Sequence, residues 1–366
     1  MIPLARPTLP KFSSIEKKLK GIFKSGMLTD SKYVGEFEQR CADFLGVENV
    51  AAVSSGTAAL TLILKCLKLK GEVILPSFTF TSGVNALFWC GLTPVFADIN
   101  PKTFNIDPAS IQKKITKKTA AILATHVFGN PCEIEKIEKI AKKNNLKVIY
   151  DAAHAFGSTY KGKSVFCFGD ASIVSFTPTK VITTAEGGLA VVKDKNFSRI
   201  LKLGRNNGDS FNRAEEFLGI TARMNEFSAI LGIEGLKIFN INLKRRLRII
   251  NLYKKELAQV NGVSLQKLEH DSFSVYKDFT ILVDEKKFGM SRDDLLQKLL
   301  KDKIQTKTYF YPPLHQKITC SKLRKSLLPE TENISSRIMS LPLYSHMPEK
   351  YVQQVCTLIK KSYVKK

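Results

Sequence analysis

From residue 47 onward the chain repeats one unit: a short apolar run, a turn, and then a segment with helical periodicity. The runs are rich in β-branched residues and bounded by Pro, Gly or Asp, as expected of parallel strands buried on both faces. Strand–helix alternation of this kind predicts an α/β sheet covered by helices on both sides. The predicted strands are VENVAAVSS (47–55), EVILP (72–76), TPVFADI (93–99), TAAILATHVF (119–128) and KVIYDAA (147–153).

The alternation changes after the fifth strand. The strands ASIVSF (171–176) and GLAVV (188–192) are separated only by a loop that carries Lys180, which predicts mixed pairing at that edge of the sheet. The helices between the earlier strands are TAALTLILKCLKL (57–69), FTSGVNALFWCG (80–91), DPASIQKKI (107–115) and EIEKIEKIAKKNN (133–145).

A second, smaller α/β domain is predicted in the C-terminal third. One long helix covers 227–260, followed by the strand SVYKDFTILV (274–283), the helix SRDDLLQKLLKDK (291–303) with a Ser cap, and a closing helix. A chain of 366 residues fits two domains well. We therefore expect a large domain over 1–240 and a small domain over 241–366.

The formal net charge of +24 raises the question of nucleic acid or a membrane as a partner. The lysines recur on helical faces such as 134–147, opposite an apolar stripe, which is typical of a solvated helix surface. No basic stripe interleaved with aromatic residues, zinc finger or RNP-like motif is visible, so we expect no nucleic-acid partner. The uncharged stretch 73–97 contains Pro, Gly and Asn, and strand–turn–helix–turn–strand explains it better than a membrane span.

The seven cysteines are odd in number and contain no C-x-x-C pair, which argues against a disulfide framework and a structural zinc site. This usage indicates a reducing compartment, and we expect a cytoplasmic protein without a bound metal. No G-x-G-x-x-G follows a strand, which excludes a nicotinamide dehydrogenase of the usual type.

Three polar motifs follow predicted strands, where ligands bind in open α/β sheets. SSGTA (54–58) opens a helix and is a candidate anion cradle, although this motif alone is better explained as a plain capped helix. Asp151 ends an apolar strand and His154 follows it; the alternative is an Asp that caps the next turn. Lys180 lies apart from other charges, so it is either a reactive amine of lowered pKa or a surface lysine.

Taken together, the motifs point to one chemistry. A phosphate cradle, a carboxylate for a pyridinium nitrogen and a lysine for an aldehyde are the fixed points of a pyridoxal phosphate site. They occur in the order cradle, Asp151, Lys180, with spacings suited to one large α/β domain.

At this point the chain resembles the DegT-type sugar aminotransferases, within the fold-type I pyridoxal phosphate enzymes. The matching motifs run nearly from end to end: RPTLP, SSGTAAL, PSFTFTSGVNA, GLTPVFADINPKTFNID, THVFGNP, YDAAHAFG, SFTPTK…EGG, ARMNEFSAILG, YFYPPLH and LPLYSHMP. The resemblance implies an α/β fold with a large domain, whose mostly parallel mixed sheet lies between helices, and a smaller C-terminal domain.

The resemblance also implies roles for individual residues. Lys180 would form a Schiff base with the cofactor and then move the substrate proton, while Asp151 would keep the pyridine nitrogen protonated. The remaining cofactor contacts would come from Gly56, Thr57, Ala58 and Ser175 at the phosphate, Phe80 stacked on the ring, His154 at the phenolic oxygen, and Thr221 of the partner subunit at the phosphate.

The family implies a homodimer with shared active sites, in which the segment containing ARMNEF (222–227) reaches the partner's site. The chain departs from the family at four positions: relatives often have His at Thr177, Gly at Ala185, an aromatic residue or His near Asn207, and Asn at Thr221. None of these changes removes a proton-transfer group.

The retained Lys180 favours transamination, because a branch of the family that dehydrates sugars replaces this lysine with histidine. The resemblance therefore implies transfer of the amino group of L-glutamate to a dTDP- or UDP-linked 4-keto- or 3-keto-6-deoxyhexose, in the biosynthesis of amino sugars for surface polysaccharide or glycan. The alternatives are a pyridoxal phosphate-dependent sugar dehydratase and a non-catalytic regulatory member of the same fold. The loops around 205–220 and 309–316 are expected to select the sugar and the nucleotide.

Overall fold

A seven-stranded mixed sheet forms the centre of the computed structural model, which describes residues 1–209, 217–323 and 326–364. One strand, β9, runs antiparallel to both of its neighbours, and the other pairs in the sheet are parallel. In spatial order the strands are β1 (Asn49–Val53), β9 (Gly188–Val192), β8 (Ala171–Ser175), β5 (Lys147–Asp151), β4 (Thr119–Thr125), β2 (Glu72–Pro76) and β3 (Thr93–Ala97).

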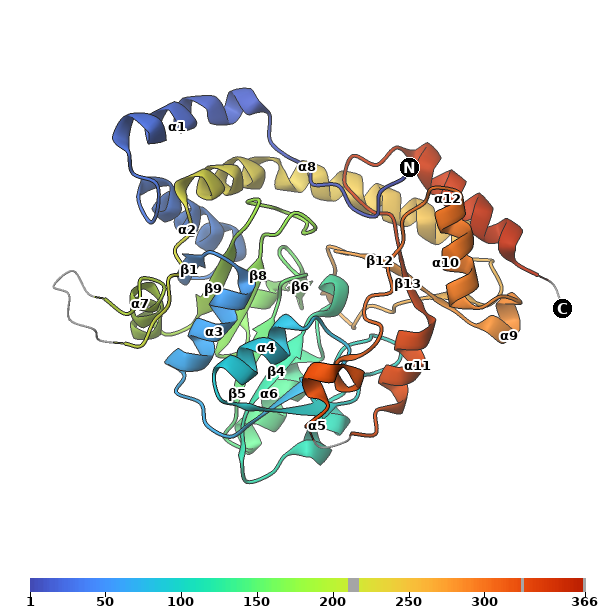
Figure 1. Ribbon diagram of the computed structural model, residues 1–366, viewed down its shortest axis with the longest axis horizontal. Coiled ribbons are helices and arrows are strands. Elements are labelled where there is room, and N and C mark those ends of the chain that lie inside the picture. Colours follow the sequence, from blue (N-terminus) through green and yellow to red (C-terminus); the bar gives the residue numbers. More distant parts are fainter. Residues whose placement is uncertain (210–216, 324–325, 365–366) are drawn as a thin grey trace.

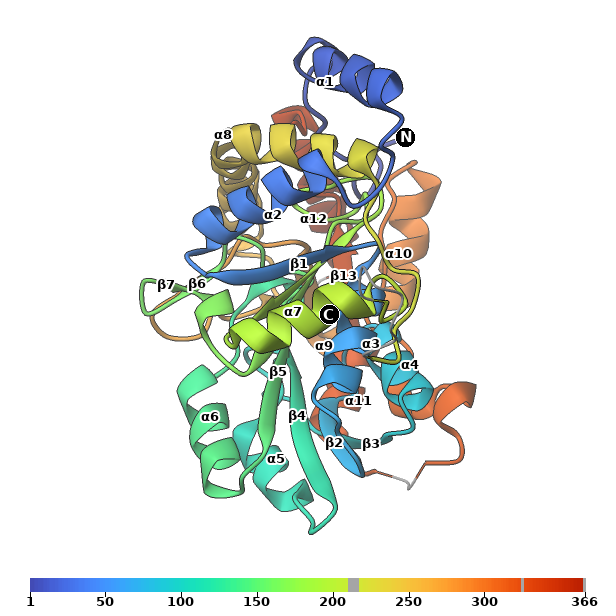
Figure 2. The ribbon, with the colours of Figure 1, turned by 90° about the vertical axis from the view of Figure 1, so that its left-hand side faces the viewer.

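Helices cover both faces of this sheet (Figures 1 and 2), as the alternation predicted. One apolar core lies between the sheet and α2 (Lys32–Leu45), α5 (Pro108–Lys114), α6 (Ile134–Lys143) and the first part of α8 (Glu226–Leu257). The core on the other face is formed with α3 (Gly56–Cys66), α4 (Ser82–Trp89) and α7 (Lys195–Gly204). The fold class is therefore the one predicted: a mostly parallel mixed sheet between two helical layers.

The mixed pairing of the two strands that flank the lysine loop is confirmed, since β8 and β9 are antiparallel over their full length. The pair does not lie at the edge of the sheet, however, because β1 hydrogen-bonds to the outer side of β9. All five residues of β9 are buried, so its outer edge needs a partner strand, and β1 provides it.

A further apolar core and an antiparallel sheet form the C-terminal part of the chain. The sheet has the order β10 (Val263–Leu265), β12 (Phe279–Val283), β13 (Ile338–Leu341), and it packs with α9 (Glu285–Phe288), α10 (Arg292–Lys301), α11 (Pro329–Arg337) and α12 (Glu349–Ser362). The predicted strand 274–283 is strand only from Phe279 onward. The expected Ser cap is present, because Ser291 Oγ accepts a hydrogen bond from the amide of Asp294 at 3.1 Å.

The long helix α8 connects the two parts and runs across the top of the molecule in Figure 1, between α2 and α12. The boundary predicted between 240 and 241 falls inside this helix, and the division into domains stays a prediction. The C-terminal core also takes in Ile2, which bridges to Ile304, so the start of the chain packs with its last third.

The remaining elements are short or lie at the periphery. They are α1 (Phe12–Ser25), the small sheet β11 (Ser272–Phe273), β6 (Thr159–Tyr160), β7 (Lys163–Ser164), and the 3₁₀ turns Val127–Gly129, Val165–Cys167, Leu314–Gln316 and Ile318–Cys320.

None of the helices in the described parts of the chain is long and apolar enough to cross a membrane.

Candidate active site

A cavity of about 320 Å³ opens at the carboxyl ends of the parallel strands. Residues at or just after the carboxyl ends of β1, β2, β4, β5 and β8 all contribute to it, as expected for an open α/β sheet. The structure brings together seven of the predicted site residues in its wall: Gly56, Thr57, Phe80, Asp151, His154, Ser175 and Lys180. Ala58 and Thr221 do not line it in the described chain.

The predicted anion cradle lies at one end of the cavity. Ser55 caps α3 by accepting a hydrogen bond from the amide of Ala58 at 3.1 Å, so this amide is already engaged. The amides of Gly56 and Thr57 lie in the first turn of the same helix, where N–H groups have no helical partner and the dipole favours an anion. Ser175, at the end of β8, lines the cavity with them.

Gly188 allows the cradle to lie against the sheet. A Cβ atom at this position would come within 2.3 Å of the Ser55 carbonyl carbon and 2.5 Å of the Gly56 nitrogen. No side chain fits at such distances, which explains the second glycine of the EGG motif. The start of α3 is therefore held in backbone contact with β9.

Asp151 is buried at the end of β5, with 6% of its surface exposed. One carboxylate oxygen accepts a hydrogen bond from the amide of Ala153 at 3.1 Å. Burial raises the pKa of Asp151, while that amide and the Lys180 ammonium act in the opposite direction. A buried carboxylate that faces a cavity is suited to pair with a cationic ring nitrogen.

His154 lies three residues further on, beside the rings of Phe128 and Phe310, whose centroids are 6.1 and 6.3 Å from its own and which also contact each other. Its Nδ1 accepts a hydrogen bond from the amide of Phe128 at 3.3 Å. Burial and the nearby Lys180 and Lys277 lower the pKa of His154 well below its usual value, so the ring is neutral and carries its proton on Nε2. This nitrogen is suited to donate to an oxygen of a ligand.

Lys180 extends from the loop between β8 and β9, and its amide donates to the Thr177 carbonyl at 3.0 Å. Burial and the nearby Lys277 ammonium lower the pKa of Lys180 to about 7, against the effect of Asp151 and Asp278. A large fraction of the amine is therefore uncharged at neutral pH, which is the condition for attack on a carbonyl carbon.

Two departures from the family pattern lie in the same loop. Thr177 lines the cavity, and its hydroxyl lies 3.5 Å from that of Ser175. Ala185 adopts a left-handed backbone conformation with φ of 65°, which glycine would adopt without strain. The preference of relatives for glycine at this position therefore has a conformational reason.

Phe80 and Thr221 are both exposed to solvent in the single chain. Phe80 lines the cavity and yet is 55% exposed, so one side of the ring has no cover from its own chain. Thr221 donates a hydrogen bond to the side chain of Asn207 at 3.0 Å, away from the cavity. The role predicted for Thr221 in the partner's site stays a prediction, and 210–216 of the neighbouring loop lies outside the described residues.

The C-terminal part closes the cavity with Lys277, Tyr309 and Phe310, none of which was predicted individually from the sequence. Tyr309 and Phe310 belong to YFYPPLH, which lies in the loop expected to select the substrate. Lys277 is the less obvious of the three. Its only sequence signal is a pair of adjacent charges, KD, directly before the apolar run FTILV.

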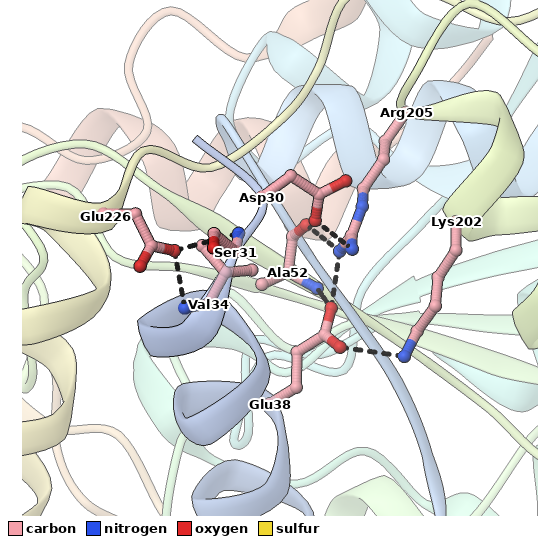
Figure 3. Close-up of polar contacts among 8 residues, drawn as sticks. All are labelled: Asp30, Ser31, Val34, Glu38, Ala52, Lys202, Arg205 and Glu226. Carbon is pink, nitrogen blue, oxygen red and sulfur yellow. Dashed lines mark hydrogen bonds and ion pairs between the residues drawn. The ribbon is translucent and has the colours of Figure 1, made fainter. Parts of the chain in front are cut away.

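A buried ionic network fixes the strand that leads into the cradle (Figure 3). Glu38 accepts a hydrogen bond from the amide of Ala52 at 2.8 Å, and Arg205 donates to the carbonyl of the same residue at 2.7 Å. Arg205 also pairs with Asp30 and with Glu38, each at 2.5 Å. These side chains satisfy both backbone groups of Ala52 at the outer edge of β1, next to the end of the strand that leads into the cradle.

The fold and the cavity define a pyridoxal phosphate-dependent enzyme of fold type I, with an amide cradle, a buried carboxylate and an uncharged amine around one space. Comparison with known proteins agrees: the profile of the DegT/DnrJ/EryC1/StrS aminotransferase family matches residues 12–360. The chain belongs to this family. It is an aminotransferase, and its cofactor is pyridoxal phosphate.

Its relatives include named sugar enzymes. The chain is 34% identical to a dTDP-4-amino-4,6-dideoxy-D-glucose transaminase of Escherichia coli, over 98% of each chain. It is 34% identical to the GDP-perosamine synthase of Escherichia coli O157:H7, over 90% of each. Among solved structures, DesI in the presence of its TDP-sugar product matches with a TM-score of 0.94 and 31% identity, over 98% of this chain and 92% of that one.

Proposed function

We propose that this enzyme transfers the amino group of L-glutamate to a keto-6-deoxyhexose linked to a nucleoside diphosphate, in the biosynthesis of amino sugars for surface polysaccharide or glycan. The observation that carries the transaminase chemistry is Lys180, an amine with a pKa of about 7 in the same cavity as the buried Asp151. The substrate class is supported by the relatives, which are named for dTDP- and GDP-linked sugars and for spore coat polysaccharide biosynthesis.

The residues of the cavity fit pyridoxal phosphate. The amides of Gly56 and Thr57, with the hydroxyl of Ser175, would bind the phosphate, and the cap bond at Ala58 would hold the turn that presents those amides. Asp151 would accept a hydrogen bond from the protonated ring nitrogen. These groups come from the ends of three strands, so the fold itself sets their separation.

Two rings would hold the face and the edge of the cofactor. Phe80 lines the cavity with a partly exposed ring that would stack on the pyridine. His154 is neutral, and its Nε2–H would donate to the phenolic oxygen. Thr221 would reach the phosphate of the partner subunit's site, as the family resemblance implies.

Bound pyridoxal phosphate supplies an aldehyde that accepts the amino group and an electron-withdrawing ring that acidifies the adjacent carbon. Lys180 Nζ would hold the cofactor and, once released, carry the proton to and from the substrate carbon. Asp151 would keep its negative charge opposite the ring nitrogen throughout. The cavity wall of Tyr309, Phe310 and Thr177 would position the sugar and limit the entry of water.

The test is incubation with pyridoxal phosphate, L-glutamate and a panel of dTDP-, UDP- and GDP-linked 3-keto- and 4-keto-6-deoxyhexoses, with product masses as the readout. An amino-sugar nucleotide is the expected product. A dehydrated sugar would instead support the dehydratase, and no product from any member of the panel would favour the regulatory alternative. Lys180→Ala should abolish the reaction and the absorbance band near ~420 nm expected of the cofactor bound through a lysine.

We also propose that the enzyme acts as a homodimer in the cytoplasm. Support for a partner comes from apolar side chains exposed on and near α4: Phe88 at 40%, Trp89 at 83% and Ile318 at 86%. Replacing Trp89 with Ser should shift the mass measured by light scattering from two chains toward one. Leu300→Ser, at a 48% exposed position on α10, is the matched control.

A further inference from the structure

Two adjacent residues of opposite charge, Lys277 and Asp278, are buried directly before β12. Only 6% of Lys277 and 9% of Asp278 is exposed. Lys277 Nζ lies 2.9 Å from each oxygen of the Asp278 carboxylate and 5.1 Å from the centre of the Tyr309 ring. Such a pair is costly to bury, so its position in the fold calls for an explanation.

The pair is oriented with respect to the cavity. Lys277 lines the cavity together with Lys180, whereas Asp278 is absent from the described residues that line it. The positive end of the pair therefore faces the space around Lys180, and the carboxylate lies behind it. Reversing the order of the two residues would present the opposite charge.

The backbone at this point is held from two sides. The amide of Lys277 donates to the carbonyl of Phe128 at 2.8 Å. From α8, the buried Arg246 donates to the carbonyl of Tyr276 at 2.8 Å and to that of Lys277. With the backbone held here and Nζ bound to both oxygens of Asp278, the buried ammonium is a fixed charge and not the end of a mobile surface side chain.

We propose that Lys277, anchored by Asp278, is a positioning residue that keeps the amine of Lys180 uncharged whenever that amine is free. This inference rests on the proposed function, because it takes Lys180 as the reactive amine. Lys277 acts through the charge that it presents and needs no contact with the substrate.

The charges that face Lys180 support this assignment. Asp151, on β5, stabilises an ammonium at Lys180, and the Asp278 carboxylate does the same from behind Lys277. The Lys277 ammonium opposes both, and its effect on the pKa of Lys180 is second only to that of burial. His154 is neutral and adds no charge. Without Lys277, the carboxylates would favour the protonated amine.

A role as the anion-binding group of the substrate fits the geometry less well. An ammonium has three N–H donors. Both oxygens of Asp278 lie within hydrogen-bond distance of Nζ, and the Tyr309 ring covers a further side. Little donor capacity is left for a carboxylate or a phosphate.

The test measures the ionisation of Lys180 in the full-length chain after the cofactor has been removed. Cyanic acid carbamoylates only uncharged amines. The rate at Lys180, followed by peptide mass spectrometry from pH 5 to 10 and corrected for the fraction of cyanate that is cyanic acid at each pH, therefore gives the midpoint of the Lys180 titration. Lys20, whose side chain is 77% exposed, serves as the reference for general reactivity in the same digest. Circular dichroism confirms that each variant is folded.

Lys277→Met should raise the midpoint of Lys180, and a rise of about one unit would slow its carbamoylation at pH 7 about fivefold. Asp278→Asn should lower the midpoint, because it removes a negative charge and leaves the ammonium. Lys277→Arg should leave it unchanged. A merely structural role would open the cavity to water in both of the first two variants and raise the midpoint in both.

An unchanged midpoint in Lys277→Met, or a shift in the same direction in Lys277→Met and Asp278→Asn, overturns the proposal. The outcome is separate from that of the proposed function, since the measurement needs neither cofactor nor substrate. If the midpoints shift as expected and no keto-sugar is aminated, the charge relationship stands and the substrate assignment fails.

Discussion

At the scale of single residues, the active site depends on charges held in an apolar surrounding. Among the described residues, the Asp151 carboxylate accepts from one amide, at 3.1 Å, and it also lines the cavity. A cationic group that binds opposite a carboxylate placed in this way would stabilise its charge further. Removing the charge of Asp151 while keeping the shape of its side chain therefore tests whether the carboxylate is needed to bind a cationic group.

Asp151→Asn should lower the rate of transamination by about a hundredfold or more, because the amide keeps the shape of the side chain but cannot hold the ring nitrogen protonated. The rate with saturating cofactor is the measurement. Asp43→Asn, the same change at an exposed position of α2, should leave the rate unchanged. A rate within threefold of the native value in Asp151→Asn would contradict the role.

Ala185→Gly should raise the free energy of unfolding by up to about 1 kcal/mol, since it relieves the left-handed conformation at φ of 65°. The gain is limited because glycine also increases the entropy of the unfolded chain. Urea unfolding of the cofactor-free protein measures the difference. Ala141→Gly, within α6, is the control and should be destabilising; a loss of stability in Ala185→Gly would refute the argument.

At the scale of elements, the start of α2 is capped from another helix. Glu226, at the start of α8, accepts hydrogen bonds from the amides of Ser31, Tyr33 and Val34 at 2.8–3.0 Å (Figure 3 shows two of them). The local cap residue Ser31 makes no side-chain cap bond of its own. The carboxylate thus replaces the local cap and ties the two helices together.

Glu226→Gln should lower the free energy of unfolding by about 2–4 kcal/mol. The substitution replaces one of the two accepting carboxylate oxygens with an NH₂ group, which cannot accept a hydrogen bond from the backbone amides. Chemical denaturation followed by circular dichroism measures the loss. The same substitution at Glu16, a 46% exposed position on α1, should change stability by less than about 0.5 kcal/mol. Equal effects at the two positions would show that the buried cap has no special importance.

At the scale of the whole molecule, buried histidines link stability to pH. His126 is fully buried, its Nδ1 accepts from the Cys132 amide at 3.0 Å, and burial lowers its pKa to about 3. The unfolded chain takes up this proton near pH 6.5, whereas the folded chain resists protonation down to about pH 3. Stability is therefore lost as the pH falls through this window.

Between pH 7 and pH 5, His126 alone should lower the free energy of unfolding by about 2 kcal/mol. In His126→Asn, the side-chain amide oxygen can replace the Nδ1 acceptor, and the titrating group is gone. The free energy of unfolding should therefore decrease between pH 7 and pH 5 by about 2 kcal/mol less than in the native protein. Urea unfolding at the two pH values is the measurement. The same pH dependence in both proteins would exclude His126 as its source.

The sequence by itself determined the central sheet, its covering helices and the residues after its strands. Those features depend on local patterns: EVILP is β2 to the residue, and Asp151 and Lys180 lie at the carboxyl ends where the alternation places ligands. Buried parallel strands are recognisable because their central residues form a nearly continuous apolar run. The family motifs added the cofactor and the kind of reaction.

Only the tertiary structure decided which distant residues complete the site. Lys277 and Phe310 close the cavity from the C-terminal part, Glu226 caps a helix nearly two hundred residues earlier, and Ile2 pairs with Ile304. Each of these contacts joins segments far apart in the chain, where no local periodicity relates one residue to the other. Whether Lys277 is a solvated lysine or a buried charge facing Lys180 depends on how two separate cores pack together, and that is a property of the folded chain alone.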